Sequence, residues 1–142
     1  MNHDTYSDAY IRDIMLKNRV FAVVGASAKT TRQSYFVMRY LSAKGYDVIP
    51  VNPGLGGQTI TARPVSASLA EIDRPVDIVD IFRKSDAAFS VTEEAIRIGA
   101  KVVWMQEGIV NQNTAEVAKE AGLDVDMDTC MRQTHKRLMS GI

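Results

Sequence analysis

The chain has 142 residues, of which 46% are hydrophobic and 24% charged, a composition typical of one folded domain and too apolar for a disordered chain. Its 17 lysines and arginines balance 17 acids, so no net positive charge attracts nucleic acid or an anionic membrane. One cysteine excludes an intramolecular disulfide, and two histidines argue against a Cys/His zinc site. We therefore expect a cytoplasmic protein without a metal site, a nucleic-acid partner or a membrane partner.

Five short runs of β-branched and apolar residues predict strands. They lie at 20–24, 47–51, 76–82, 101–105 and 124–127. Segments with helical periodicity are found at 7–18, 34–45, 66–72, 85–99 and 114–122. Ser34 and Ser85 are the expected N-caps of two of these helices, and glycines follow three of them.

Strands that alternate with helices must run parallel, and near-continuous apolar strands such as VFAVV must be covered on both faces. The order of elements predicts an α/β fold, a single Rossmann-like doubly wound domain over residues 1–142 with a five-stranded parallel sheet. Residues 1–18 form an N-terminal helical extension in this prediction. Ligands bind such folds beyond the carboxyl ends of the strands where the winding reverses, expected here between the first and fourth strand runs.

The loop after the first strand run, GASAKTTRQS, has the composition of a phosphate-binding loop. A glycine permits a tight turn, small residues let backbone amides approach a ligand, and the following helix N-terminus favours an anion. Two cations can add charge-assisted hydrogen bonds, although a solvated connection would have the same residues. The candidate contacts are Gly25, Ala26, Ser27, Ala28, Lys29, Arg32 and Ser34.

This loop lacks the GxGxxG fingerprint of dinucleotide binding, because Gly25 is its only glycine. The second strand run ends at Asn52, where an NAD site has an acid for the ribose hydroxyls. Both features disfavour NAD, whereas Asn52 is compatible with a phosphorylated ribose. The turn that Asn52 and Pro53 begin, NPGLGG, either wraps a ligand or is a plain connection.

The third and fourth strand runs end in further candidate contacts. Phe82 offers a flat face for an adenine ring, with Arg83 and Lys84 beside it, although core packing and a solvated rim explain these residues equally well. Gln106 can both donate and accept hydrogen bonds, and Gly108 allows close approach of a ligand.

The tail MDTCMRQTHKRL contains Cys130 and His135. On a helix, residues five apart do not share a face, and spacing alone does not establish a catalytic pair. No catalytic residue is assigned, and Cys130 follows the last strand run.

Four blocks in order resemble the YccU-like single-domain CoA-binding proteins, which are similar to the CoA-binding domain of the succinyl-CoA synthetase alpha subunit. They are VVGASAKTTRQSYFVMRYLSAKGYDVIPVNP, VDIVDIFRK, AIRIGAKVVWMQEGIVN and AGLDVDMDTCMRQTHKRL. The resemblance implies that CoA phosphates face Ala28, Lys29, Thr30 and Thr31. It also implies that the pantetheine arm is bordered by Gln106, Glu107 and Gly108. Leu55 stands where the synthetase domain has a CoA-contacting lysine, so other cations must compensate.

The loop and the resemblance together predict a protein that binds coenzyme A or an acyl-CoA as a small-molecule ligand, without catalysis of its own. One alternative is an NADP-type or other nucleotide-dependent oxidoreductase. The other is a regulatory interaction domain with a vestigial pocket.

Overall fold

The structure, a computed structural model, describes residues 7–106 and 108–139. Its centre is a five-stranded sheet in the order β2-β1-β5-β6-β7, in which all neighbouring strands run parallel. The five-stranded parallel sheet predicted from the sequence is therefore confirmed, although three strands are shorter than their predicted runs. The strands are β1 (Val20–Val24), β2 (Asp47–Val51), β5 (Ile78–Ile81), β6 (Val102–Met105) and β7 (Asp124–Asp126).

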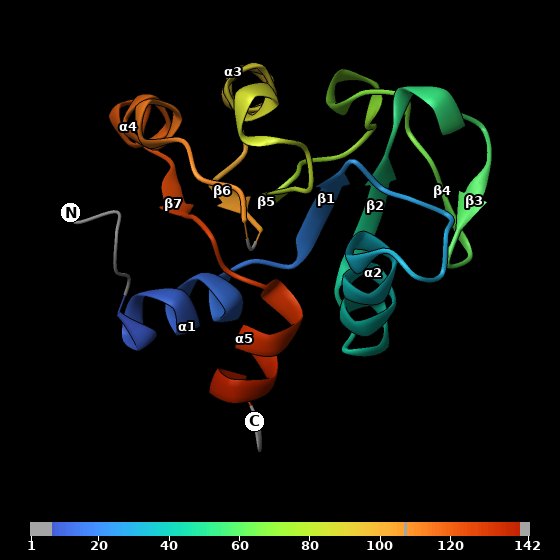
Figure 1. The fold of residues 1–142 in the computed structure, drawn as a ribbon, viewed down its shortest axis with the longest axis horizontal. Coiled ribbons are helices and arrows are strands. Elements are labelled where there is room, and N and C mark those ends of the chain that lie inside the picture. The colour runs from blue at the N-terminus through green and yellow to red at the C-terminus, as the bar shows by residue number, and fades with distance from the viewer. Residues whose placement is uncertain (1–6, 107, 140–142) are drawn as a thin grey trace.

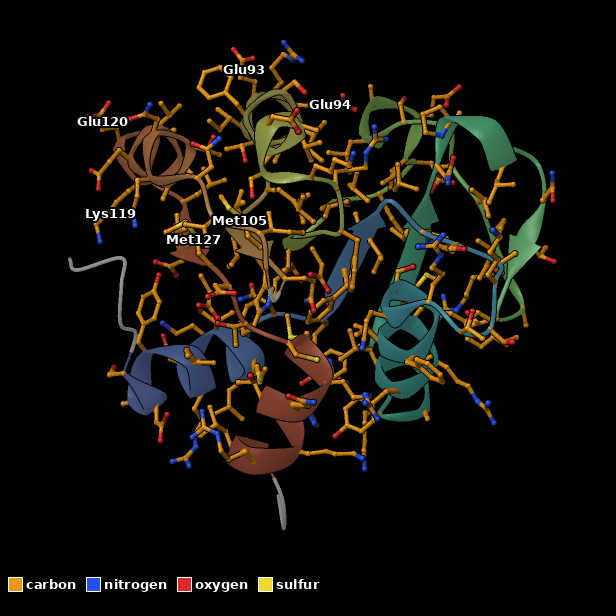
Figure 2. All side chains as sticks on the ribbon, viewed as in Figure 1. Glu93, Glu94, Met105, Lys119, Glu120 and Met127 are labelled. Carbon is orange, nitrogen blue, oxygen red and sulfur yellow. The ribbon has the colours of Figure 1, made fainter. Side chains whose placement is uncertain are left out.

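Helices cover both faces of the sheet (Figure 1). One face carries α1 (Asp8–Lys17), α2 (Gln33–Ala43) and α5 (Met131–Met139), and the other carries α3 (Ala88–Arg97) and α4 (Gln112–Glu120). Alternate strand residues enter two separate core clusters, so that Trp104 packs with α5 while Met105 packs beneath α3 and α4 (Figure 2). Because both faces are covered, the strands read as continuous apolar runs.

The winding direction reverses between β1 and β5. The chain first places β2 on one side of β1 and then returns to pair β5 with the other side. This is the 2-1-3-4-5 order of the doubly wound folds, in which the reversal lies between the first and third strand runs. The expectation of a reversal between the first and fourth runs was wrong, because it assumed the six-stranded order.

Both predicted serine caps were wrong. Arg32 occupies the N-cap position of α2 without a side-chain cap, and Ser34 is buried in the first turn. A 3-10 turn, η3 (Ser85–Ala87), precedes α3, and the Ser85 hydroxyl accepts a hydrogen bond from the Val110 amide instead. Residues that can cap a helix are thus used here for packing and for a loop contact.

The segment between β2 and β5 departs furthest from the prediction. The helix expected at 66–72 is only a 3-10 turn, η2 (Leu69–Glu71), and another turn of the same length, η1 (Pro53–Leu55), follows β2. An antiparallel hairpin of β3 (Thr59–Ile60) and β4 (Arg63–Pro64) was not predicted. Strands of two residues are too short for alternation to reveal them.

The helix α5 was also missed, for a different reason. Its buried positions follow the helical spacing i, i+3, i+4 and i+7, but two of the four are polar. They are Met131, Thr134, His135 and Leu138. Apolar periodicity alone does not detect a helix that buries a hydroxyl and an imidazole. Within the described ranges, no helix combines the length and apolar character that a membrane crossing requires.

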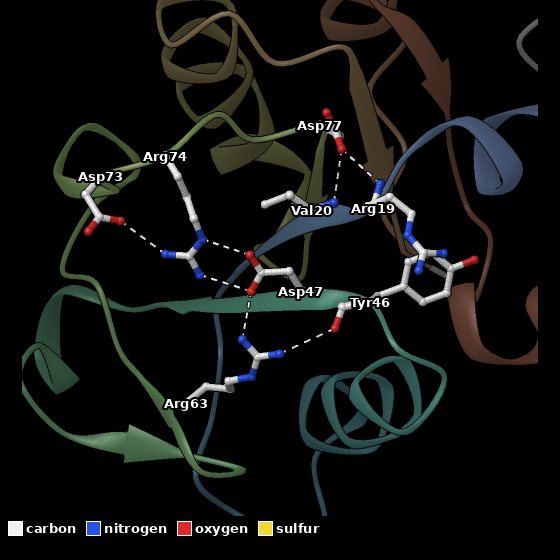
Figure 3. A network of polar contacts seen from close by, with 8 residues as sticks. All are labelled: Arg19, Val20, Tyr46, Asp47, Arg63, Asp73, Arg74 and Asp77. Atoms are coloured by element: carbon white, nitrogen blue, oxygen red, sulfur yellow. Dashed lines mark hydrogen bonds and ion pairs between the residues drawn. The ribbon is translucent and has the colours of Figure 1, made fainter.

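At the amino-terminal ends of the strands, Asp47 connects the start of β2 to β4 and to the segment before β5 (Figure 3). Its carboxylate accepts hydrogen bonds from Arg63 Nη1 at 2.7 Å and from Arg74 Nε at 2.8 Å, and a second bond from Arg74 at 3.0 Å. Hydrogen bonding from Arg74, reinforced by Arg63, holds the pKa of Asp47 below its ordinary value. Asp47 thereby ties the β3-β4 hairpin and the segment before β5 to the start of β2.

We predict that Asp47→Ala lowers the free energy of unfolding by about 1 kcal/mol at neutral pH, because two guanidinium partners lose one acceptor. Because folding lowers the pKa of Asp47, this contribution is fully present above the unfolded-state pKa. It is lost as pH falls from there through the lower folded-state pKa. Urea unfolding of the variant and wild type across acidic and neutral pH measures the difference. Asp13→Ala is the matched control, since Asp13 forms an exposed pair with Lys17; equal losses in both variants would contradict the joining role.

Candidate functional site

The loop that follows β1 is pressed against the end of β5. Gly25 has a φ of +91°, and its amide and that of Ala26 both donate to the Val51 carbonyl at the end of β2. A Cβ on Gly25 would lie 3.2 Å from the Phe82 carbonyl carbon and 3.2 Å from Arg83 Cδ. The glycine therefore allows the close approach of β1, β2 and β5 at the point where the winding reverses.

Asn52 connects this loop to the turn after β2. Its Nδ2 donates to the Ala26 carbonyl at 2.8 Å, and its Oδ1 accepts from the Gly54 amide at 2.8 Å. The side chain thus has a structural reason for its identity besides any ligand. Pro53 is exposed and lines a separate hollow with Gly54.

A first cavity of about 570 Å³ opens over the loop, and the N-terminus of α2 faces it. No side chain caps that terminus, so the amides of Gln33 and Ser34, the first two of the helix, are available to an anion, whereas the Tyr35 amide donates to the Arg32 carbonyl. Of the residues predicted to contact a ligand, nine line this cavity: Gly25, Ala26, Ser27, Lys29, Thr31, Arg32, Ser34, Asn52 and Phe82. Ala28 and Thr30 are exposed and do not line it.

A second cavity of about 350 Å³ adjoins the first, and Gln33 and Phe82 line both. Five predicted residues line it: Phe82, Arg83, Lys84, Gln106 and Gly108. Glu107, also predicted there, lies outside the described residues. The shared residues show that the two cavities are neighbours, and together we call them the strand-end site.

Four residues of the strand-end site were not among the predicted contacts. Gln33 begins α2, Ile109 follows Gly108, and Gln133 lies in the first turn of α5. Cys130, which the sequence places after the last strand, also lines the second cavity. Gln133 was missed because α5 was not predicted.

Cys130 and His135 do not form a pair. His135 Nδ1 lies 2.8 Å from the Tyr40 hydroxyl of α2, and burial lowers the pKa of the imidazole. Cys130 instead faces the second cavity, one residue before α5 begins. The geometry assigns His135 to packing between α2 and α5.

Gln106 forms part of the floor of the second cavity and is held from two sides. Its Nε2 donates to Asp80 Oδ1 at 2.6 Å, and its Oε1 accepts from the Met131 amide at 3.4 Å. Burial raises the pKa of Asp80 to about 8. A lone acid inside the apolar strand run IVDIF was the sequence signal for this buried group.

The cations of the strand-end site form no ion pair with a described residue. Within residues 7–106 and 108–139, no ion pair engages Lys29, Arg32, Arg83 or Lys84. Over the same ranges, no group of three or more His, Cys, Asp or Glu side chains is arranged to hold a metal. The site can therefore attract a phosphate-bearing ligand through exposed cations and free backbone amides.

The fold is a doubly wound α/β domain, and two adjoining cavities lie at its switch point. The chain belongs to the CoA-binding domain family, whose model matches residues 19–136. This confirms the family inferred from the sequence blocks, while membership of the YccU-like group stays a prediction.

Relatives match along most of the chain. The uncharacterized protein YneT of Bacillus subtilis (strain 168) is 40% identical over 129 residues, which cover 91% of this chain and 94% of that protein. A hypothetical protein from Pyrococcus horikoshii OT3 has a TM-score of 0.92 and 37% identity, covering 99% of this chain and 97% of its own. A Thermus thermophilus protein, cell-free ID.343, has a TM-score of 0.89 and 35% identity, covering 94% and 99%.

We predict that Gly25→Ala destabilises the protein more than Gly45→Ala. Both glycines have a φ of +91°, but nothing lies within 4 Å of a Cβ at Gly45. Each substitution costs about 1 to 2 kcal/mol for the backbone conformation. Gly25→Ala adds about 1 to 3 kcal/mol for crowding against Phe82. Urea unfolding measures the free energy of unfolding of both variants. Equal losses would show that the contact between Gly25 and Phe82 can widen at no energetic cost.

Proposed function

We propose that this protein binds coenzyme A or an acyl-CoA in the strand-end site, through the loop after β1, and catalyses no reaction of its own. The observation that carries the proposal is the adjacency of two cavities that share Gln33 and Phe82, one with backbone amides and cations and one with amide side chains. Coenzyme A has the same order of groups, with a nucleotide diphosphate followed by an arm that contains two amides.

The first cavity suits the diphosphate. The N-terminus of α2 supplies backbone amides and a favourable dipole, and small residues of the loop keep side chains out of the way. Lys29 and Arg32 are exposed beside it and have no competing partner among the described residues. Each can form a charge-assisted bond with a phosphate oxygen.

The second cavity suits the pantetheine arm. Gln106 and Gln133 offer amides for its two amide groups, while Phe82 and Ile109 offer apolar contacts. Leu55 packs against the core cluster beneath α2, so it replaces the lysine of related domains with an apolar contact. Arg83 and Lys84 lie at the second cavity as the cations that compensate for it.

The experiment that tests this function is calorimetric titration with CoA, acetyl-CoA, NAD and NADP. We predict that CoA binds more tightly than either dinucleotide, because the loop has one glycine and the Asn52 amide is already bonded to Ala26 and Gly54. Tighter binding of NADP would favour the oxidoreductase alternative. Binding of none of the four would favour an interaction domain.

We predict that Lys29→Ala and Arg32→Ala each weaken CoA binding by about 1 to 3 kcal/mol, because each removes a charge-assisted hydrogen bond. Neither side chain is buried, so circular dichroism of both variants should match wild type.

Lys119→Ala is the matched control for these variants, since Lys119 is exposed on α4, which covers the other face of the sheet (Figure 2). Wild-type affinity in the Lys29→Ala/Arg32→Ala double variant would show that both cations are only solvated. An equal loss in Lys119→Ala would show a non-specific effect of charge.

A further inference from the structure

Three side chains form a buried row across the sheet beneath α5. Asp80 on β5, Trp104 on β6 and Asp126 on β7 are register partners, and each has no exposed surface. Register partners of neighbouring parallel strands point to the same face, and Trp104 packs in one cluster with Met131 of α5. Two acids without exposed surface in a largely apolar layer need a physical reason.

Each member of the buried row holds the junction of residues 129–131, which connects β7 to α5. Trp104 Nε1 donates to the Thr129 carbonyl at 2.9 Å. The Thr129 hydroxyl lies 3.1 Å from Asp126 Oδ1 and 2.9 Å from the Met127 carbonyl, and its one proton is shared between these two acceptors. Asp80 acts through Gln106, which accepts from the Met131 amide. The junction and the first turn of α5 carry Cys130 and Gln133 into the second cavity.

Neither acid is neutralised by a cation. Among the described residues, no ion pair involves Asp80 or Asp126, and the Oδ2 atom of each is buried without a hydrogen-bond partner. Burial raises the pKa of Asp80 to about 8 and that of Asp126 to about 7, so at neutral pH Asp80 is mostly protonated and Asp126 is near its titration midpoint.

Other ionisable groups lie on the elements packed against the row. Asp128 adds to the raised pKa of Asp126, burial raises the pKa of Tyr10 to about 12, and burial lowers that of His135. These groups are Tyr10 on α1, Asp128 and Cys130 in or beside the junction, and Arg132 and His135 on α5.

We infer that Asp80 and Asp126 are positioning residues of the strand-end site, whose neutral carboxyls hold the 129–131 junction in the conformation that receives the pantetheine arm. The inference rests on the proposed function. Ionisation of either acid places an uncompensated charge in the core, and the junction relaxes to let water reach it. Ligand binding, which needs the ordered junction, then favours the protonated acids, and by linkage affinity falls as pH rises.

The test is calorimetric titration with CoA from about pH 6 to about pH 9. In wild type we expect affinity to fall by about five- to tenfold over this range, at the low end of coupling between sites. The Asp80→Asn/Asp126→Asn variant keeps neutral side chains of the same shape, so its affinity should fall less. The ionising groups of CoA are common to both proteins, and the difference between the two curves removes their effect.

Trp104 gives a second readout, because it is the only tryptophan and lies between the two acids. Its fluorescence in the ligand-free protein should titrate between about pH 6 and about pH 9 in wild type and not in the double variant. Thr92→Val is the control, since Thr92 is equally buried on α3 with an unpartnered hydroxyl. This control should keep the wild-type pH dependence.

Parallel pH curves for wild type and the double variant would overturn the positioning role while leaving CoA binding intact. Absence of CoA binding by wild type at every pH would instead overturn the proposed function, and the positioning role with it. The two failures are therefore distinguishable.

Discussion

The pairing of β1 with both β2 and β5 is the constraint on which the rest of the structure depends. Right-handed crossovers place α2 on one face and α3 on the other once β5 returns to the free side of β1. Because the two crossovers leave β1 toward opposite faces, the loop after β1 lies between them and contacts the ends of β2 and β5. The strand-end site exists because these three strand ends converge.

Charge is distributed unequally between the amino-terminal and the carboxyl-terminal ends of the strands. At the amino-terminal ends of the strands, Asp47 accepts from two arginines and Asp77 accepts from two backbone amides (Figure 3). Asp77 also pairs with Lys101 at 3.4 Å. At the carboxyl edge, the exposed cations have no acidic partners among the described residues. A chain without net charge therefore still has a group of exposed cations at the carboxyl ends of its strands.

The predicted elements succeeded where local periodicity was strong and failed where packing overrode it. Strand runs such as VFAVV and the helix over α2 were recognised because both are buried along a regular spacing. The segment 66–72 has apolar residues at helical spacing but too few buried positions, and it forms only the 3-10 turn η2. The helix α5 forms although its local pattern does not predict it. Its polar residues Thr134 and His135 are buried by contacts with other elements, which the local sequence does not show.

By itself the sequence determined the strand runs, four of the five helices and the loop residues at the strand ends, because these depend on neighbours along the chain. Tertiary structure alone decided the order of the strands and hence the switch point at β1 and β5. It also decided that the Asn52 amide bonds to Ala26 and that Gln133 joins the second cavity. These outcomes depend on residues far apart in the chain, which meet only when the crossovers and α5 have packed against the sheet.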